Sequence, residues 1–255
     1  MKTAQLSRVL KALQSDDEDE RFAAMDELEA LDSPETLARL PRSTLDALVE
    51  LIGDEDLDRS VAVIELVGRA RLASATEALL ARVASERANN PRCFLQRPFS
   101  ASLEALARCA PDDPRVLELM VGNLSSIREV QFRQSSIRAL MVMGRSNSAA
   151  HAALRTLSER GDEWERVQAH WALFGLDGDA AAHVAPVVAA LASKASGEAV
   201  RGAALLALCD LGAAALPALD AAAKAKGPAA RTAKDAAAMI RSGRTLDPSL
   251  SVRRE

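Results

Sequence analysis

The chain has 255 residues, of which 49% are hydrophobic and 27% are charged, a balance typical of a folded globular protein with ample length for a core. Aromatic residues make up only 3%, with no Tyr, while Ala and Leu dominate, so the composition favours helix and argues against an all-β or α/β fold. The formal net charge of -4 disfavours a general nucleic-acid binder, although a local basic face stays open.

Amphipathic segments of roughly 12 to 17 residues, separated by short breaks rich in Asp, Gly, Ser and Pro, predict consecutive antiparallel helices along the whole chain. The first hairpin contains an acidic run, Asp16 to Glu20, which we interpret as a turn and the negatively charged first turn of a helix rather than a cation site. The predicted hairpins are 3–40, 41–70, 72–110, 113–144, 147–176, 179–212 and 213–242.

The third hairpin is interrupted by Ala88 to Phe99 (ANNPRCFLQRPF), which holds two of the five Phe residues and two prolines. One interpretation is a long interhelical loop whose Phe94 and Phe99 fold back onto the core. The other is a partner-binding loop, in which Arg92 and Arg97 flank an apolar anchor, because long loops are often functional and this composition is enriched at protein interfaces.

The fourth hairpin carries a run of arginines, namely Arg128, Arg133, Arg138 and Arg145, within one predicted helix and its end. Such a run is commonly a solvated face. The alternative is a basic strip for an acidic partner or a nucleic-acid backbone.

The fifth hairpin contains both tryptophans, in the segment EWERVQAHWALFGL. Trp164 and Trp171 are seven residues apart and therefore lie on roughly one side of a helix, where they could form a binding hot spot. The alternative is packing between neighbouring repeats. We interpret His170, beside Trp171, as a core histidine with satisfied hydrogen bonds rather than a pH switch.

Five segments align on an arginine with a small residue three positions on and Leu seven positions on. The position four on is apolar in every copy except His170, and this spacing forms one helix face. The arginines are Arg21, Arg59, Arg133, Arg166 and Arg201, and a degenerate copy is expected at Ser100 to Ala110. An acid lies three or four positions before each arginine: Glu18, Asp56, Glu129, Glu163 and Glu198. In the HEAT-repeat family, which these segments resemble, the arginine pairs with such an acid, and this separation allows contact on a helix.

A period of this size is the signature of a helical array. The copy EAVRGAALLALCDLGAAALPAL, with Arg201, Leu208, Gly212 and Pro217, resembles the second helix of a HEAT repeat of the short bacterial kind. The resemblance implies an all-α, right-handed α-solenoid of about seven HEAT-like hairpins, with second helices on the concave face. We expect residues 1–242 to form one repeat domain, followed by a flexible C-terminal tail at 243–255.

No common catalytic motif occurs in the sequence: it has no phosphate-binding Gly-rich loop, no G-x-S-x-G and no H-E-x-x-H. His151, His170 and His183 lack a ligand partner three or four residues ahead, so no metal and no cofactor are expected. The cysteines, Cys93, Cys109 and Cys209, form no C-x-x-C and fit a reducing compartment. No signal peptide or apolar stretch of about 18 residues is found, so we expect a cytoplasmic protein without a membrane partner.

From the array and the missing chemistry we expect a non-enzymatic scaffold that binds a protein partner in its groove. The predicted contacts are Arg92, Phe94, Arg97, Phe99, Arg138, Trp164 and Trp171. The alternative is a DNA-binding or DNA-repair protein of the HEAT-like alkylpurine glycosylase kind, which the arginine run suggests. A phycobilin lyase, which shares the short repeat, is a remote alternative.

Overall fold

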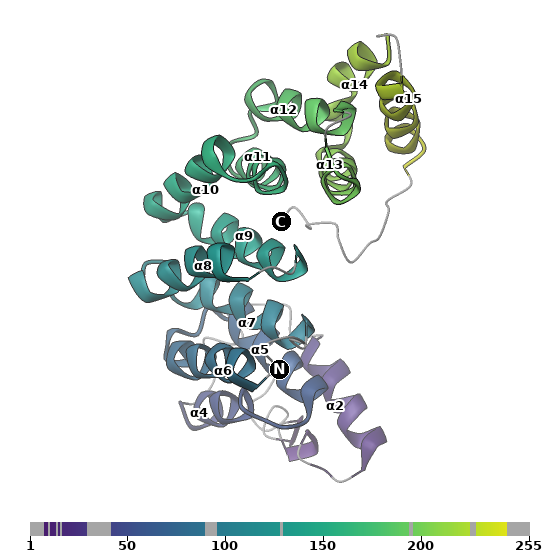
Figure 1. The fold of residues 1–255 in the computed structure, drawn as a ribbon. Coiled ribbons are helices and arrows are strands. Elements are labelled where there is room, and N and C mark those ends of the chain that lie inside the picture. The colour runs from purple at the N-terminus through teal and green to yellow at the C-terminus, as the bar shows by residue number, and fades with distance from the viewer. Residues whose placement is uncertain are drawn as a thin grey trace. The chain divides into compact units, whose positions relative to one another are not determined.

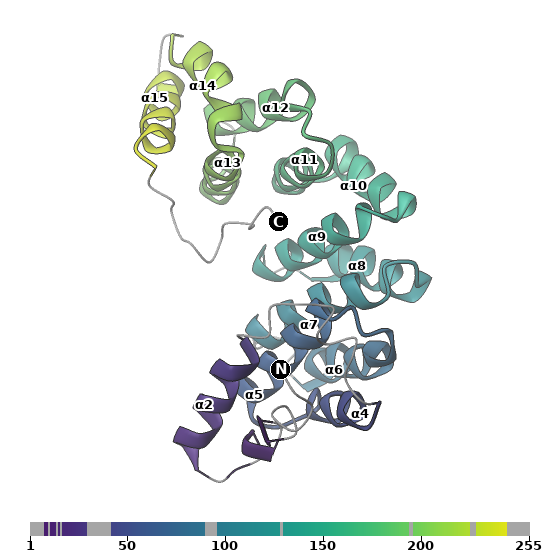
Figure 2. The same ribbon diagram turned by 180° about the vertical axis from the view of Figure 1, so that it is seen from behind.

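The computed structural model describes residues 8–29 apart from 10, 14 and 16, together with 42–89, 96–127, 130–193, 196–224 and 228–243. These residues form helices and turns, with no strand among them. The chain divides into two compact units, Met1–Asn147 and Ser148–Glu255, and each is described by itself (Figures 1 and 2).

The unit Met1–Asn147 is an array of helical hairpins in which each second helix packs on the second helix of the next hairpin. The second helices α2, α5, α7 and α9 contact one another in this order, while α4, α6 and α8 each pack on the following second helix (Figure 1). The bounds are α2 Glu18–Glu29, α4 Arg42–Leu51, α5 Leu57–Arg69, the 3-10 turn η1 Ala73–Ala75, α6 Thr76–Asn89, α7 Gln96–Cys109, α8 Pro114–Ser126 and α9 Val130–Gly144.

The unit Ser148–Glu255 repeats the same arrangement. Its hairpins are α10 with α11, α12 with α13 and α14 with α15, and the second helices α11, α13 and α15 again contact in order (Figure 2). The bounds are α10 Ser148–Arg160, α11 Glu163–Asp177, α12 Ala180–Ala192, α13 Glu198–Leu211, the 3-10 turn η2 Gly212–Ala215, α14 Leu216–Ala223 and α15 Pro228–Arg241. The predicted all-α solenoid of stacked hairpins is confirmed.

The repeated columns of the sequence are the core of each hairpin. The small residue three positions after each arginine is buried in all five copies, and so is every described Leu seven positions on. The third hairpin obeys the same rule when it is aligned on Phe99, because Ser102, Leu103 and Leu106 are all fully buried. The degenerate copy therefore lacks only the arginine, whose position Phe99 occupies.

Aspartates begin five of these helices, one of them Asp17, which accepts the backbone N–H of Asp19 at the start of α2. Asp56, Asp113, Asp162 and Asp179 each accept a hydrogen bond from a backbone N–H in the first turn of α5, α8, α11 and α12 respectively. Such a cap satisfies an N–H that has no partner within the helix. The Asp-rich breaks of the sequence are therefore helix N-termini.

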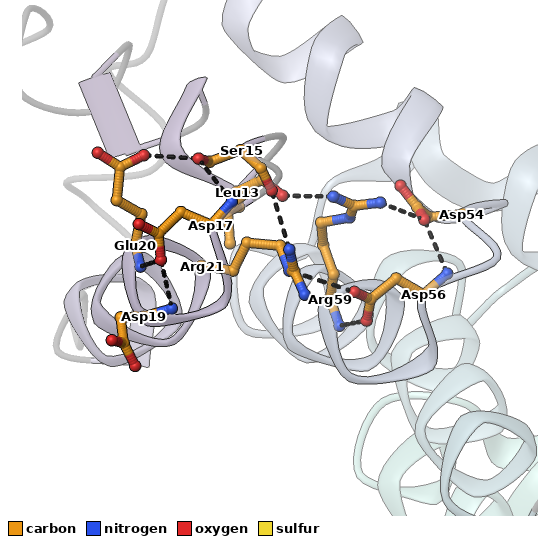
Figure 3. A network of polar contacts seen from close by, with 9 residues as sticks. All are labelled: Leu13, Ser15, Asp17, Asp19, Glu20, Arg21, Asp54, Asp56 and Arg59. Carbon is orange, nitrogen blue, oxygen red and sulfur yellow. Dashed lines mark hydrogen bonds and ion pairs between the residues drawn. The ribbon is translucent and has the colours of Figure 1, made fainter.

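Arg59 does not pair with Asp56, the acid that was expected to be its partner. Arg59 forms its ion pair with Asp54, at 2.6 Å, and also donates to the carbonyl of Leu13 in the preceding hairpin (Figure 3). Asp56 is occupied by the N-cap and lies 3.6 Å from Nε of Arg21. The network in Figure 3 thus joins one hairpin to the next, because Arg59 reaches Leu13 and Asp56 reaches Arg21.

The arginines of the second unit follow a related rule. Arg166 donates to the carbonyl of Gly161, at 2.9 Å, and Arg201 donates to the carbonyl of Ser196, each five residues before the arginine. Glu163, expected to pair with Arg166, instead accepts a hydrogen bond from the hydroxyl of Ser196 in the next hairpin. Among the described side chains, the acids and arginines of the repeat therefore fix turns and neighbouring hairpins.

Gly68 lets α5 approach α7 closely. A Cβ atom at Gly68 would lie 3.0 Å from both Cα and Cβ of Ala105. We expect Gly68→Ala to lower the free energy of unfolding by about 1–3 kcal/mol, because the close-packed helices must move apart. The matched control is Gly122→Ala in α8, where nothing lies within 4 Å; it should raise stability by up to about 1 kcal/mol through helix propensity. Urea unfolding measures both, and equal effects of the two substitutions would show that the α5–α7 contact is wrong.

One stretch of the described residues, Glu198–Ala223, has the length and apolar composition that a membrane-spanning helix needs, contrary to the sequence expectation. In the structure it is folded as α13, η2 and α14, with a change of direction at Gly212, whose φ is 58°. Buried helices of a repeat array pass the same compositional test, since their apolar residues face neighbouring helices.

Candidate functional site

The exposed side of α7 carries two arginines on one helix face. Arg97, Glu104 and Arg108 are spaced by seven and four residues and therefore lie on the same side. Arg97 is exposed and lies 3.7 Å from Asp58, while Arg108 is half-buried and lies 3.4 Å from Glu104. Both ion pairs are open to solvent, so they leave the arginines accessible to a partner.

The neighbouring helix α9 continues this surface without any acid. Its sequence, VQFRQSSIRALMVMG, contains arginine but no Asp or Glu. Arg138 is half-buried, and Arg145, seven residues on and just after the helix, is exposed. α7 and α9 pack on each other. Arg97 and Arg108 of α7, Arg138 of α9 and Arg145 just after it are together called the arginine face below, and Glu104 is the one acid in these two helices.

Three of the four aromatic residues predicted to contact a partner lie in the described residues, and none of the three is on the surface. Phe99 is fully buried and meets Phe132 of α9 edge-on, with ring centroids 5.4 Å apart. Trp164 and Trp171 are 5% and 6% exposed. Of the two sequence interpretations, core packing fits all three side chains, because an aromatic ring contributes most where water is excluded.

The remaining predicted residues fall into two groups. Arg92 and Phe94 lie outside the described residues, as does the middle of the predicted loop. Both ends of that loop are helical, because α6 extends to Asn89 and α7 begins at Gln96. Arg97 is exposed and Arg138 is half-buried, and both belong to the arginine face.

All three histidines of the chain lie on the consecutive helices α10, α11 and α12, and two of them touch. Nδ1 of His170 lies 3.2 Å from Nδ1 of His183, and Nε2 of His183 lies 3.0 Å from Oδ2 of Asp177. The rings are tilted by 46°. The turn between α11 and α12 positions Asp177, whose other oxygen accepts the N–H of Asp179 at 2.8 Å. These residues, Asp177, His183 and His170, are called the histidine chain below.

Burial and charge act on the two ends of the histidine chain. Burial lowers the pKa of His170, and the positive charges of His183 and Arg166 lower it further. Burial alone would raise the pKa of Asp177, but the N–H of Asp179, the hydrogen bond from His183 and the charges of His183 and His151 outweigh it, so this pKa lies below its usual value. Near neutral pH the histidine chain therefore has an ionised carboxylate, Asp177, at one end and a neutral ring, His170, at the other.

The two described cysteines have little nucleophilic character. Burial raises the pKa of Cys109 to about 11, and its thiol donates to the carbonyl of Val67 at 3.4 Å. Burial and then the charge of Asp210 raise the pKa of Cys209. A thiol held protonated in this way is a poor nucleophile and a poor metal ligand. Within the described ranges, no group of three or more His, Cys, Asp or Glu side chains is arranged to hold a metal ion.

The chain is similar in fold to a solved complex. That structure is the complex of CpcE and CpcF of phycocyanin lyase from Nostoc sp. PCC7120, with a TM-score of 0.47, 17% sequence identity, and coverage of 96% of this chain and 90% of that chain. No family model matches the sequence, and no curated protein is significantly similar to it. Membership of the HEAT family stays a prediction.

One expectation is corrected. We expected a non-enzyme, because common catalytic motifs are missing. The solved complex just described is named for a lyase. Missing motifs are not evidence against catalysis, because one fold hosts many unrelated functions.

The histidine chain is the cluster that sequence reasoning missed. His170 was noticed as the polar residue in an apolar column, but His183 was considered only for metal ligands three or four residues away, and Asp177 was not considered. The available signal was the interval of thirteen residues from His170 to His183, which crosses one tight turn and so places the two side chains on facing helices.

Proposed function

We propose that the chain binds an acidic segment of a partner protein across the arginine face of α7 and α9. The observation that carries the proposal is that α9, Val130–Gly144, contains arginine but no Asp or Glu, and that two further arginines lie on one face of α7. Helical arrays bind partners along rows of stacked helices, since each helix adds one strip to a continuous surface.

Charge explains why a protein segment is favoured over nucleic acid. The acidic chain as a whole, with a net charge of -4, repels an extended polyanion. Near the start of the same unit the exposed side chains of Asp17, Asp19 and Glu20 add negative charge. A short acidic segment needs only the local basic surface, and guanidinium groups bind carboxylates with two parallel hydrogen bonds. Arg92 and Phe94, which precede α7 in the chain, are proposed to contribute to the same contact.

The test uses a fluorescein-labelled glutamate-rich peptide and fluorescence anisotropy. We expect salt-sensitive binding by the wild type, and an affinity about three- to tenfold lower for the double variant Arg97→Gln/Arg138→Gln, because each partly exposed charge contributes about 0.2–1 kcal/mol. Arg42→Gln is the matched control, since Arg42 is an exposed arginine on α4, outside the arginine face.

Three results would contradict the proposal. They are equal binding of a glutamine-rich peptide, unchanged affinity in the double variant, and tighter salt-sensitive binding of duplex DNA than of the acidic peptide. The last would favour the nucleic-acid alternative. The lyase alternative stays a hypothesis from the repeat pattern.

A further inference from the structure

We propose that the histidine chain is a proton-exchange site, in which one proton is held between the two rings and Nε2 of His170 is the atom that takes up or releases a proton. The proposal concerns α10 to α12 and does not depend on the arginine face.

The hydrogen bonds assign the protons. The carboxylate of Asp177 can only accept, so Nε2 of His183 must carry the proton of their 3.0 Å contact. A neutral His183 ring then has a lone pair on Nδ1, and the 3.2 Å contact requires Nδ1 of His170 to donate to it. A neutral His170 protonated on Nδ1 presents an unprotonated Nε2. His170 is partly exposed whereas His183 is 8% exposed, so exchange with solvent takes place at His170.

Proton uptake occurs in two distinct steps. The first proton passes from hydronium to the lone pair of Nε2 on His170; the pair of rings gains one positive charge, which the carboxylate of Asp177 balances, and both hydrogen bonds remain. A second proton can be added only at Nδ1 of His183. Two N–H groups would then face each other, so the contact between the rings breaks, and with it the ring-to-ring link from α11 to α12.

The charged side chains around the histidine chain favour a neutral His170 and an ionised Asp177. The charges that bear on the site are Arg166 on α11, whose charge opposes protonation of His170, and His151 on α10, which acts on Asp177. The other ionisable side chains on the helices that pack against α11 are Arg155, Glu159 and Arg160 on α10 and Glu198, Arg201, Cys209 and Asp210 on α13. His183 is the only ionisable side chain that α12 adds.

Nuclear magnetic resonance of the full chain labelled with ¹⁵N-histidine tests the assignment directly, because only three histidines contribute signals. Long-range ¹H–¹⁵N spectra distinguish the tautomers. At about pH 8 we expect His170 in the Nδ1–H form and His183 in the Nε2–H form, and on acidification Nε2 of His170 should titrate with a midpoint below 6.5. His151→Asn assigns the third signal set, and at about pH 8 it should leave the tautomers of the other two histidines unchanged. An Nε2–H form of neutral His170, or rapidly mixed tautomers in both rings, would overturn the proposal.

A second measurement follows the fold. Since the pKa of His170 is lowered in the folded state, the unfolded state takes up its proton first as the pH falls below about 6.5, so this stabilising contribution is complete above that pH and is lost on acidification. The melting temperature of the wild type should therefore fall more between about pH 8 and pH 5 than that of His170→Asn, whose amide can still donate to His183 but cannot titrate. An equal fall in both proteins would argue against His170 as the exchanging group.

Discussion

Replacement of Phe99 by Ala is expected to lower the free energy of unfolding by about 3–5 kcal/mol, which is the usual cost of deleting a buried aromatic side chain. Phe99 is 0% exposed, and its ring packs edge-on against Phe132 across the contact between α7 and α9. Phe99 occupies the position that holds an arginine in the other aligned hairpins, and Ala is too small to fill the space of its ring. We therefore expect a cavity between two second helices and a large fall in the midpoint of urea unfolding, measured by circular dichroism.

The control for this prediction lies two residues earlier. Arg97→Ala removes an exposed side chain whose ion pair with Asp58 is 3.7 Å long, so it should change stability by less than about 0.5 kcal/mol. If Phe99→Ala were as stable as Arg97→Ala, Phe99 would not be part of the core, and the interpretation of a surface anchor would regain support.

The sequence predicted the helical array because its signal is repeated. A small residue, an apolar residue and a leucine at fixed distances from an arginine describe one buried face, and five copies make a chance match improbable. The aligned small residues and leucines are buried because every hairpin must cover the same face of its neighbour. The degenerate hairpin was harder to read, since Phe99 takes the place of the arginine by which the other copies were found.

The contacts of the arginines could not be predicted in the same way. Sequence spacing favoured pairs three or four residues apart on one helix, as for Arg59 with Asp56. The structure instead uses Asp56 to cap α5 and pairs Arg59 with Asp54, because an aspartate before a helix finds an unsatisfied N–H closer than any guanidinium. The conformation of the turn decides which of two nearby acids caps the helix and which one pairs with the arginine. The spacing of residues in the sequence does not give that conformation.

The candidate sites show the opposite imbalance. Unusual residues were taken as functional, yet Phe99, Trp164 and Trp171 are buried, because scarce aromatic side chains in an Ala-rich array fill the largest gaps between helices. Among the predicted contacts that the structure describes, only the arginines reach the surface: Arg97 is exposed and Arg138 is half-buried. The histidine chain was invisible to motif searches since its members meet through a turn and not through a fixed short spacing.

Replacement of Trp171 by Ala should likewise reduce stability by about 3–5 kcal/mol, in the unit Ser148–Glu255. Trp171 is 6% exposed and lies on α11, which contacts α10, α12 and α13, so we expect its loss to leave a cavity in the core of this unit. The chain has two tryptophans and no Tyr, and both tryptophans are on α11. Intrinsic fluorescence therefore reports on this unit alone, and Trp164 remains as the probe in the variant.

The readout separates a core role from a binding role for Trp171. As a core residue, its replacement should move the fluorescence-detected unfolding of Trp164 to lower urea concentration, while Arg155→Ala, on the exposed side of α10, should leave it within about 0.5 kcal/mol of the wild type. Binding of the glutamate-rich peptide should be unchanged under conditions in which the variant is folded, because that peptide is proposed to contact α7 and α9. Unchanged stability together with weakened peptide binding would instead return Trp171 to the partner-binding surface.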